Sequence, residues 1–357
     1  MDEFSKSGQD LARDLLDWYD IHGRDLPWRR NVTAYTTWIS EVMCQQTQVA
    51  TVIPYFNEFI NRFPTIADLS EADLDEVLQY WAGLGYYSRA RNMHAAAKAV
   101  HHRGAFPETL RQLKELPGVG VYIASAVGSI AMGIDTPAVD GNLHRVLSRL
   151  YRDNGNRAHK RDIAAALLPP GRAGDFNQAL MDLGAMICKP KNWECQRCPL
   201  RPYCQGFLVG DIHRFPQPTK RRRPPIRQAV CAVVKHGQHV LLARRPSHGL
   251  YGGLHDLPWV FLEGEESHRA ALDRALKAAN LAELAASYSL GESTLVKHTL
   301  THMRIEQHVY TVDLSDLGPR SLTFSPEGDG LKWTTATDSE AIGISTLCAK
   351  CLSSIGY

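Results

Sequence analysis

Two carboxylic acids occupy positions where an enzyme could use one as a proton donor and the other as a stabilising charge. Glu41 lies in the apolar run WISEVMCQQTQV, whose spacing predicts a helix that Ser40 could cap. A glutamate there is either a solvated residue of the first helical turn or a buried acid with a raised pKa, and the spacing alone favours the solvated residue. Asp140 falls in the tight turn VDGN, where its plainer role is to cap the next helix.

A glycine pattern between these two acids is suited to holding a phosphate. In LPGVGVY, Pro117, Gly118 and Gly120 end one helical pattern and open another, which runs from Val121 to Met132. The unpaired backbone N–H groups at such a helix start can bind a phosphate without a charged side chain. The alternative is a helix–turn–helix packing unit, and the glycines alone leave both open. A phosphate-binding site close in sequence to a carboxylate suggests chemistry on a nucleic acid.

Four cysteines within seventeen residues predict a metal centre. Their spacing, Cys-x6-Cys-x2-Cys-x5-Cys, suits an iron–sulfur cluster or a structural zinc ion; the four are Cys188, Cys195, Cys198 and Cys204. Cys44 and Cys231 lie in apolar segments and are predicted to be core residues, and the pair Cys348 and Cys351 is predicted to bind nothing. Eight cysteines with four clustered indicate a reducing compartment rather than a disulfide framework.

Three polar or aromatic stretches could contact DNA, and each has a plainer alternative. The segment WAGLGYYSRAR could insert an aromatic ring between bases and pair arginines with phosphates, or its tyrosines could pack in a core. Gln45, Gln46 and Gln48 could reach base edges, or could simply be exposed helix residues. The segment RDLPWR, which starts at Arg24, is on its own better explained as a packed loop with a buried Trp than as a substrate contact.

Length and composition set modest limits. The 357 residues suggest two or three domains, and 44% hydrophobic residues can form ordinary globular cores. A net charge of +2 means that any DNA-binding surface must be local. The start MDEFSKSGQD lacks an apolar signal region, and no run approaches the ~20 apolar residues of a membrane span. We therefore expect no membrane association. The further expectation, a cytoplasmic protein of bacterial type held at the nucleoid through DNA, rests on the family resemblance described below.

The elements that must position these residues form a helical part followed by an α+β part. Helical patterns fill residues 1–215, with a helix-hairpin-helix at about 108–133 and the cysteine loop at 188–204. A proline-rich, basic stretch at 216–228 reads as a linker. Residues 229–357 combine β-rich runs, a helix at about 267–279 and further strands at 294–313 and 330–334.

Taken jointly, the motifs resemble one family over essentially the whole chain. LPWR, SEVMCQQTQV, GLGYYSRARN, LPGVGVY, AVDGN, FNQALMDLGA and the cysteine spacing are similar to those of the MutY family of adenine DNA glycosylases, in the helix-hairpin-helix glycosylase superfamily. The resemblance implies a base excision repair enzyme that removes adenine mispaired with 8-oxoguanine or guanine. It implies a helical catalytic domain whose four cysteines hold a [4Fe-4S] cluster, a Nudix-like domain that recognises 8-oxoguanine, and a monomer bound to double-stranded DNA.

The resemblance also assigns roles to matching residues. Glu41 resembles the general acid that protonates adenine at N7, and Asp140 the carboxylate that stabilises or captures the oxocarbenium sugar; two carboxylates with split pKa values suit glycoside chemistry. Tyr122 and Asn142 match positions that support the sugar and Asp140. The expected DNA and base contacts are Arg24 and Gln178 at the flipped adenine, Gln46, Thr47 and Tyr86 in the stack around 8-oxoguanine, and the hairpin glycines Gly118 and Gly120.

Three departures from related patterns refine the expected activity. Related glycosylase-lyases carry a Schiff-base lysine where this chain has Tyr122, so we expect a monofunctional enzyme that leaves an abasic site. The glutamate-dense Nudix motif is missing, since EESHRAALDRAL follows Gly264, so hydrolysis there is not expected. The family's Phe-Ser-His loop becomes Leu300-Thr301-His302, in which Thr301 keeps the hydroxyl and Leu300 lacks the aromatic face.

Two other functions remain as alternatives. One is a thymine-glycol-type glycosylase-lyase, against which Tyr122 and the long C-terminal part argue. The other is a non-enzymatic iron–sulfur protein that binds DNA or carries electrons. Glu41 and Asp140 in their full motif context argue against this second alternative.

Overall fold

The computed structural model describes residues 2–217, 224–246, 249–286, 288, 290–315, 330–335 and 342–357, and part of the proposed linker lies outside these ranges. The chain divides into two compact units, of which the first comprises Met1–Glu71 and Asn92–Lys220. The second comprises Ala72–Arg91 and Arg221–Tyr357. Among the helices of the described ranges, none has both the length and the apolar character that a membrane crossing needs.

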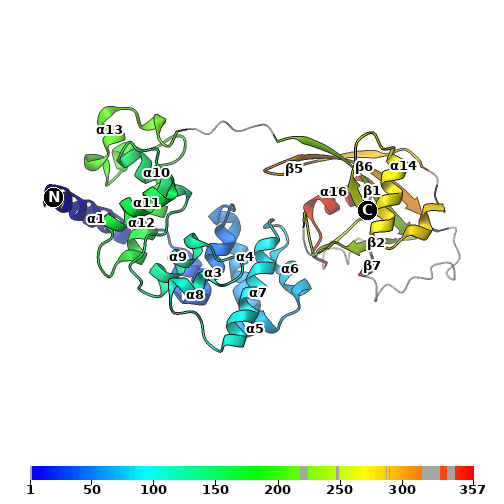
Figure 1. Cartoon of the computed structure of the whole chain (residues 1–357), viewed down its shortest axis with the longest axis horizontal. Coiled ribbons are helices and arrows are strands. Elements are labelled where there is room, and N and C mark those ends of the chain that lie inside the picture. The colour runs from blue at the N-terminus through cyan, green and yellow to red at the C-terminus, as the bar shows by residue number, and fades with distance from the viewer. Residues whose placement is uncertain are drawn as a thin grey trace. The chain divides into compact units, whose positions relative to one another are not determined.

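The first unit is built from helices (Figure 1). They are α1 (Asp2–His22), α2 (Pro27–Arg30), α3 (Ala34–Cys44), α4 (Val49–Arg62), α5 (Ile66–Glu71), most of α7 (Ser88–Arg103), α8 (Leu110–Lys114), α9 (Val121–Ala131), α10 (Gly141–Leu150), α11 (Arg157–Leu167), α12 (Ala173–Met186) and α13 (Gln205–Val209). Short 3₁₀ turns connect α12 to α13 and follow α13.

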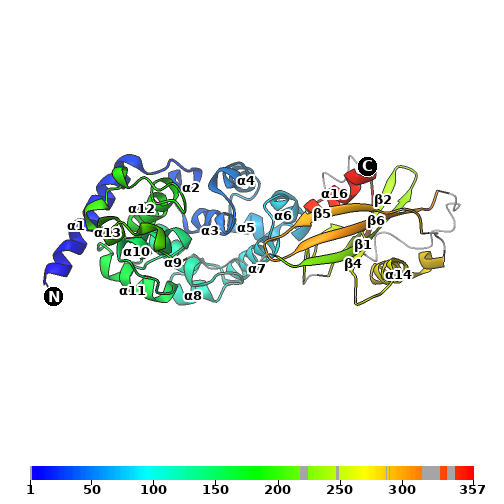
Figure 2. The same cartoon turned by 90° about the horizontal axis from the view of Figure 1, so that it is seen from above.

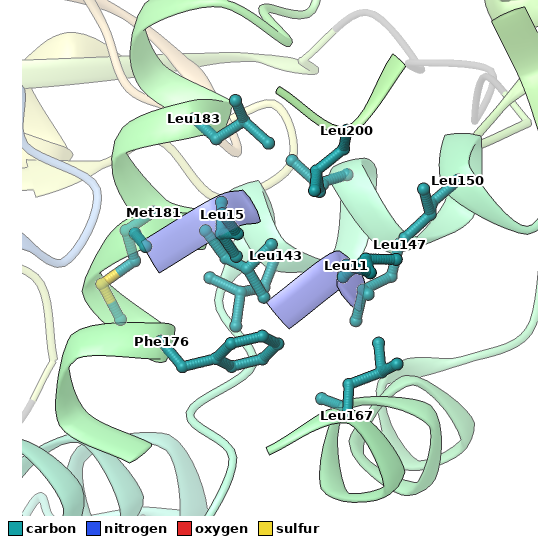
Figure 3. Packing of buried hydrophobic residues seen from close by; sticks show 14 of the residues in the cluster. Leu11, Leu15, Leu143, Leu147, Leu150, Leu167, Phe176, Met181, Leu183 and Leu200 are labelled. Atoms are coloured by element: carbon teal, nitrogen blue, oxygen red, sulfur yellow. The ribbon is translucent and has the colours of Figure 1, made fainter. Parts of the chain in front are cut away.

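One core ties the N-terminal helix to helices from the other end of this unit. Leu11 and Leu15 of α1 are buried, as are Leu143 and Leu147 of α10. Figure 3 shows these side chains gathered in one cluster, into which Leu200 from the cysteine-bearing loop also points. Burying a leucine side chain contributes about 1.5–3 kcal/mol. The loop that carries the four cysteines is therefore anchored to the same core that holds α10.

The helical hairpin α8–α9 has the geometry that its glycines require. Thr109 caps α8 by accepting a hydrogen bond from the Gln112 N–H. Gly118 has a φ of +75°, and a Cβ there would lie 2.7 Å from the Cβ of Asn92, so the position admits only glycine. Gly120 is the N-cap of α9 and has no side-chain cap. Open space surrounds the position of a Cβ at Gly120, so the N-terminus of α9 is accessible.

The second unit is a mixed sheet with helices on both faces, preceded in sequence by α6 (Leu74–Trp81) (Figure 2). The strand order is β3-β2-β1-β6-β5, with β4 paired to β1 and β7 paired to β2. β1 and β6 are parallel and the other pairs are antiparallel. The strands are β1 (Ile226–His236), β2 (His239–Arg244), β3 (His255–Asp256), β4 (Trp259–Phe261), β5 (Thr294–Thr299), β6 (Arg304–Asp313) and β7 (Leu331–Thr334).

Strand β1 is buried on both faces, which explains its continuous apolar sequence. Cys231 and Val233 belong to a core cluster that includes residues of α16 (Thr346–Ser354). Val230 and Ala232 belong to a second cluster that includes residues of α14 (His268–Ala278). The prediction that Cys231 is a core residue is confirmed, because its side chain has no exposed surface.

Candidate active site

Glu41 lies deep within α3 rather than at its start. Thr33 caps the helix, because its Oγ1 accepts a hydrogen bond from the Thr36 N–H (3.0 Å) while the Thr33 N–H donates to Thr36 Oγ1 (3.0 Å). The proposed Ser40 cap is wrong: Ser40 is buried inside the helix and donates to the Thr37 carbonyl (2.9 Å). The interpretation of Glu41 as a first-turn residue fails for the same reason.

The carboxyl group of Glu41 meets the second residue of α9. Tyr122 Oη donates a hydrogen bond to Glu41 Oε2 at 2.5 Å. The pKa of Glu41 is raised to about 7, and burial is the main cause. The charge of Asp140 also raises the pKa, whereas the hydrogen bond from Tyr122 and the charge of Arg29 lower it. Glu41 therefore holds its proton in a large fraction of molecules near neutral pH, as a general acid must.

Asp140 is held by hydrogen-bond donors at the start of α10. Its Oδ1 accepts from the Leu143 N–H (2.7 Å) and its Oδ2 from Asn142 Nδ2 (2.9 Å). The N-cap interpretation of Asp140 is thus confirmed. Burial raises the pKa of Asp140, whereas the hydrogen bonds from Leu143 and Asn142 and the charge of Arg145 lower it. These donors stabilise the carboxylate form, but burial outweighs them, so the pKa of Asp140 stays above its usual value.

Arg145 and Gly184, which belong to none of the predicted site residues, hold Asn142 in place. Arg145 Nη2 donates to Asn142 Oδ1 (2.8 Å) and to the Gly184 carbonyl (2.8 Å), and its Nε donates to the Cys188 carbonyl (2.9 Å). A Cβ on Gly184 would lie only 2.6 Å from the Cβ of Asn142, so α12 can approach α10 only with glycine here. The three-residue spacing of Asn142 and Arg145 is the one sequence signal for this contact.

A buried ion-pair network lies beside the site on α12. Asp182 has no exposed surface and accepts hydrogen bonds from Arg24 N (2.8 Å), Arg24 Nε (2.7 Å) and Arg29 Nη1 (2.8 Å). Burial raises the pKa of Asp182, but the hydrogen bonds and charge of Arg29 and the bonds from Arg24 lower it below its usual value. Asp182 therefore fixes Arg24, part of whose side chain stays exposed. Gln178 lies on α12, one helical turn before Asp182.

The remaining predicted contact residues occupy turns with exposed side chains or backbone. Gln46 is exposed, with a φ of +58°, and Thr47, which follows it, is partly exposed. In the second unit Tyr86 is exposed, with a φ of +48°, whereas its neighbour Tyr87 is buried. The competing interpretation of a buried tyrosine pair thus holds for Tyr87 and is wrong for Tyr86.

The second unit brings two of its predicted contact residues together. Tyr86 Oη donates to Thr301 Oγ1 at 3.1 Å. Thr301 and His302 are both exposed, in the turn between β5 and β6. Among these predicted residues, Tyr86 and Thr301 are joined across 215 positions of sequence.

The four clustered cysteines lie on the segment between α12 and the start of α13, and none of them forms a disulfide. The pKa of Cys198 is raised to about 12: burial is the main cause, a backbone N–H bond from Leu200 acts against it, and the charges of the other three thiols act with it. Arg149 Nη1 donates to Cys188 Sγ at 3.3 Å. No group of three or more His, Cys, Asp or Glu side chains within the described ranges is arranged to hold a metal ion. The Arg149 donor to Cys188 Sγ is the kind of N–H contact that stabilises a thiolate ligand.

Comparison with known proteins decides the family. Residues 39–170 match the HhH-GPD superfamily of base excision DNA repair proteins, and residues 229–354 match the NUDIX domain. Adenine DNA glycosylase of Rattus norvegicus is 36% identical over 402 residues, covering 95% of this chain and 77% of that protein. The Homo sapiens protein is 35% identical, covering 94% and 72%. The chain belongs to the adenine DNA glycosylase family.

Solved structures agree with the fold of this adenine DNA glycosylase family member. A thermostable thymine-DNA glycosylase is 28% identical with a TM-score of 0.55, over 58% of this chain and 100% of that chain. An endonuclease III–DNA complex, 21% identical with a TM-score of 0.51, covers 58% and 97% and shows the shared fold alone. The expected helical glycosylase fold followed by a Nudix-like α+β fold is thus confirmed.

Proposed function

We propose that this glycosylase hydrolyses the N-glycosidic bond of adenine mispaired with 8-oxoguanine or guanine in double-stranded DNA. It does so as a monofunctional monomer and leaves an abasic site. Family membership supports removal of adenine in base excision repair. The observation that supports the chemistry is that the two acids have different surroundings. Glu41 has a pKa near 7 and accepts a hydrogen bond from Tyr122, whereas Asp140 accepts hydrogen bonds from Asn142 and the Leu143 N–H.

Glu41 and Asp140 have complementary roles in the proposed reaction. Protonated Glu41 gives its proton to adenine N7, which makes the base a better leaving group as the bond to the sugar breaks. Asp140, kept ionised by Asn142 and the Leu143 N–H, stabilises the oxocarbenium charge that develops or captures the cation before water attacks. Tyr122 orients the acid through its 2.5 Å hydrogen bond.

The remaining predicted residues supply DNA contacts in this proposal. The accessible N-terminus of α9 at Gly118 and Gly120 supports a phosphate contact there. Arg24 and Gln178 contact the flipped adenine, whose extrusion costs a few kcal/mol. Exposed residues in turns probe the stack and the opposing base; they are Gln46, Thr47, Tyr86, Thr301 and His302.

The four cysteines hold a [4Fe-4S] cluster in this proposal. Cys188, Cys195, Cys198 and Cys204 would each supply a thiolate, and the cluster would act structurally on the segment that follows α12. Arg145 and Arg149 of α10 both donate to the Cys188 carbonyl, and Arg145 also donates to Asn142 Oδ1, so this one arginine links the cysteine segment to the start of α10.

Three duplexes test the proposal: adenine opposite 8-oxoguanine, adenine opposite guanine, and thymine glycol opposite adenine. Released base and strand scission are measured separately, with and without borohydride. We expect adenine release from the first two, strand breaks only after alkali, and little borohydride-trapped adduct, because Tyr122 cannot form a Schiff base. Efficient trapping of a mapped lysine, or release of thymine glycol alone, would place the protein among the glycosylase-lyases.

A further inference from the structure

Two histidines meet in the second unit where α14 begins on the sheet. His268 is the first residue of α14 and His308 lies on β6, and their ring centres are 4.5 Å apart with the ring planes inclined at 47°. Tyr310, two residues after His308 on the strand, belongs to the core cluster that includes α14, so His308 faces this helix as well. Both histidines are partly exposed, so a dissolved ion can reach them.

Each of these histidines has one ring nitrogen next to a hydroxyl group. His268 Nδ1 lies 2.6 Å from Tyr310 Oη, and His308 Nδ1 lies 3.2 Å from Ser293 Oγ, just before β5. Among the described residues neither Nε2 atom has a hydrogen-bond partner, and both Nε2 atoms are accessible to solvent. When a hydroxyl oxygen accepts the Nδ1 proton, the lone pair of the ring lies on Nε2. Metal-binding histidines commonly donate their other ring N–H in this way, which fixes the tautomer and the ring orientation.

The surroundings of His308 favour a neutral imidazole, which is the form that binds metal ions. Burial and then the charge of His268 lower the pKa of His308, whereas the charge of Glu306 raises it. In the part of the chain that the structure describes, no third His, Cys, Asp or Glu joins the two rings in a metal-binding group. The pair can therefore supply two nitrogen ligands, and water must supply the others.

The separation of the two rings indicates which ions they could share. With a metal–nitrogen bond of about 2.0–2.1 Å, an ion on the lone-pair axis of Nε2 lies roughly 3.2 Å from the ring centre. At that distance, ring centres 4.5 Å apart correspond to an angle of roughly 90° at the ion. Such an angle belongs to square-planar, tetragonal or octahedral sites, which suit Cu²⁺ and Ni²⁺, whereas Zn²⁺ prefers the wider angles of a tetrahedron.

We propose that His268 and His308 form a binding site for a transition-metal dication of the Ni²⁺ and Cu²⁺ class, with one Nε2 ligand from each histidine. The bound ion would join the start of α14 to β6, which the Tyr310 hydroxyl already links through His268. It would therefore stabilise the second unit against unfolding. The proposal does not depend on the glycosylase activity, whose acids lie in the first unit.

Titration of Ni²⁺ into the full-length, untagged protein in a calorimeter tests the proposal. We expect one saturable binding event that His268→Ala and His308→Ala each weaken by about tenfold or more. The double variant should lose no more than either single variant, because two ligands of one ion act as a unit. Tyr310→Phe keeps both ligands and removes the hydroxyl at His268 Nδ1, so it should weaken the same event by roughly tenfold.

His239→Ala is the matched control, because His236 and His239 face each other across the β1–β2 turn and form another close histidine pair in the second unit. This variant should bind Ni²⁺ as the wild-type protein does. Ni²⁺ should also raise the melting temperature of the wild-type and His239→Ala proteins and leave that of the double variant unchanged. Survival of the binding event in the double variant overturns the proposal. Loss of the event in His239→Ala, or equal weakening in every histidine variant, overturns it as well, because either result places Ni²⁺ elsewhere on the surface.

Discussion

Burial gives Glu41 its near-neutral pKa, and this effect outweighs the opposite effect of the hydrogen bond from Tyr122. Replacing Glu41 by glutamine keeps the size and removes the proton donor. We expect Glu41→Gln to bind mismatched DNA while its single-turnover rate falls by two orders of magnitude or more, about the contribution of general acid catalysis. Asp140→Asn should lose a similar factor, since an amide cannot offset the oxocarbenium charge. Near-normal rates in either folded variant would refute the assigned roles.

The pH dependence of the chemical step follows from the same two residues. Protonated Glu41 is the active form, so the single-turnover rate should fall tenfold per pH unit above about 7. Asp140 must be ionised, and its raised pKa predicts a second decline on the acid side. Single-turnover rates between pH 5 and 9 check both limbs. A rate that stays level from pH 7 to 9 would contradict protonation by Glu41.

Stability supplies an independent check on the raised pKa of Glu41. A group with a higher pKa in the folded than in the unfolded protein binds its proton more tightly when folded, so it contributes stability at low pH. That contribution is lost as pH rises through about 7. Glu41→Gln, which cannot ionise, should therefore melt above the wild-type temperature at pH 8 to 9, and the difference should shrink below pH 5.

At the scale of elements, the crossing of α10 and α12 positions Asn142 and hence Asp140. Gly184→Ala places a Cβ 2.6 Å from the Asn142 Cβ and must displace that residue. We expect at least a tenfold loss in single-turnover rate. Gly174→Ala, on the same helix, meets the Ser129 carbonyl oxygen at 2.6 Å instead. It should lower the melting temperature and leave the single-turnover rate of the folded protein unchanged. If both variants lose the same factor in rate, Gly184 has only a packing role.

The cysteine segment gives a second prediction at this scale. Wild-type protein should contain about four irons per chain and be brown, as a [4Fe-4S] cluster requires. Cys198→Ser should lower the yield of folded protein more than the single-turnover rate of what folds, because Leu200 of this segment is anchored in the core around α10. Cys231→Ala, in the second unit, should keep its iron. Zinc without iron in anaerobically prepared wild-type protein would exclude the cluster.

Sequence patterns predicted the elements better than their contacts. The apolar run of β1 and the turn chemistry of the α8–α9 hairpin are local signals, and the structure has both. Ser40 and Thr33 are both competent caps, and only the packing of α3 selects Thr33. The pairing of Arg24 with Asp182 spans 158 positions, so no local pattern could reveal it. For the same reason the hydrogen bond from Tyr86 to Thr301, across 215 positions, could not be inferred from composition or spacing.

At the scale of the whole molecule, the second compact unit combines two separate stretches of the chain, so deleting the C-terminal part affects both. Ala72–Arg91, from within the glycosylase sequence, belongs to the same compact unit as the Nudix-like sheet. Tyr87 Oη donates to the Ile344 carbonyl at 3.4 Å, and Tyr86 bonds Thr301. Removing residues 229–357 therefore also removes packing partners of this segment. Point variants in the intact chain must accompany any truncation.

Truncation and point substitution in the C-terminal part should both weaken the preference for 8-oxoguanine over guanine. Deleting residues 229–357 should shrink the rate advantage of 8-oxoguanine over guanine while adenine excision stays detectable, because Glu41, Tyr122 and Asp140 all lie in the first unit. Full-length Thr301→Ala/His302→Ala should reproduce much of that shrinkage without the packing loss, since each satisfied base-edge contact typically contributes ~1–3 kcal/mol. Thermal melts of both proteins separate folding from recognition. If the folded truncation keeps the full preference, the opposing base is recognised by residues outside 229–357, around Gln46, Thr47 and Tyr86.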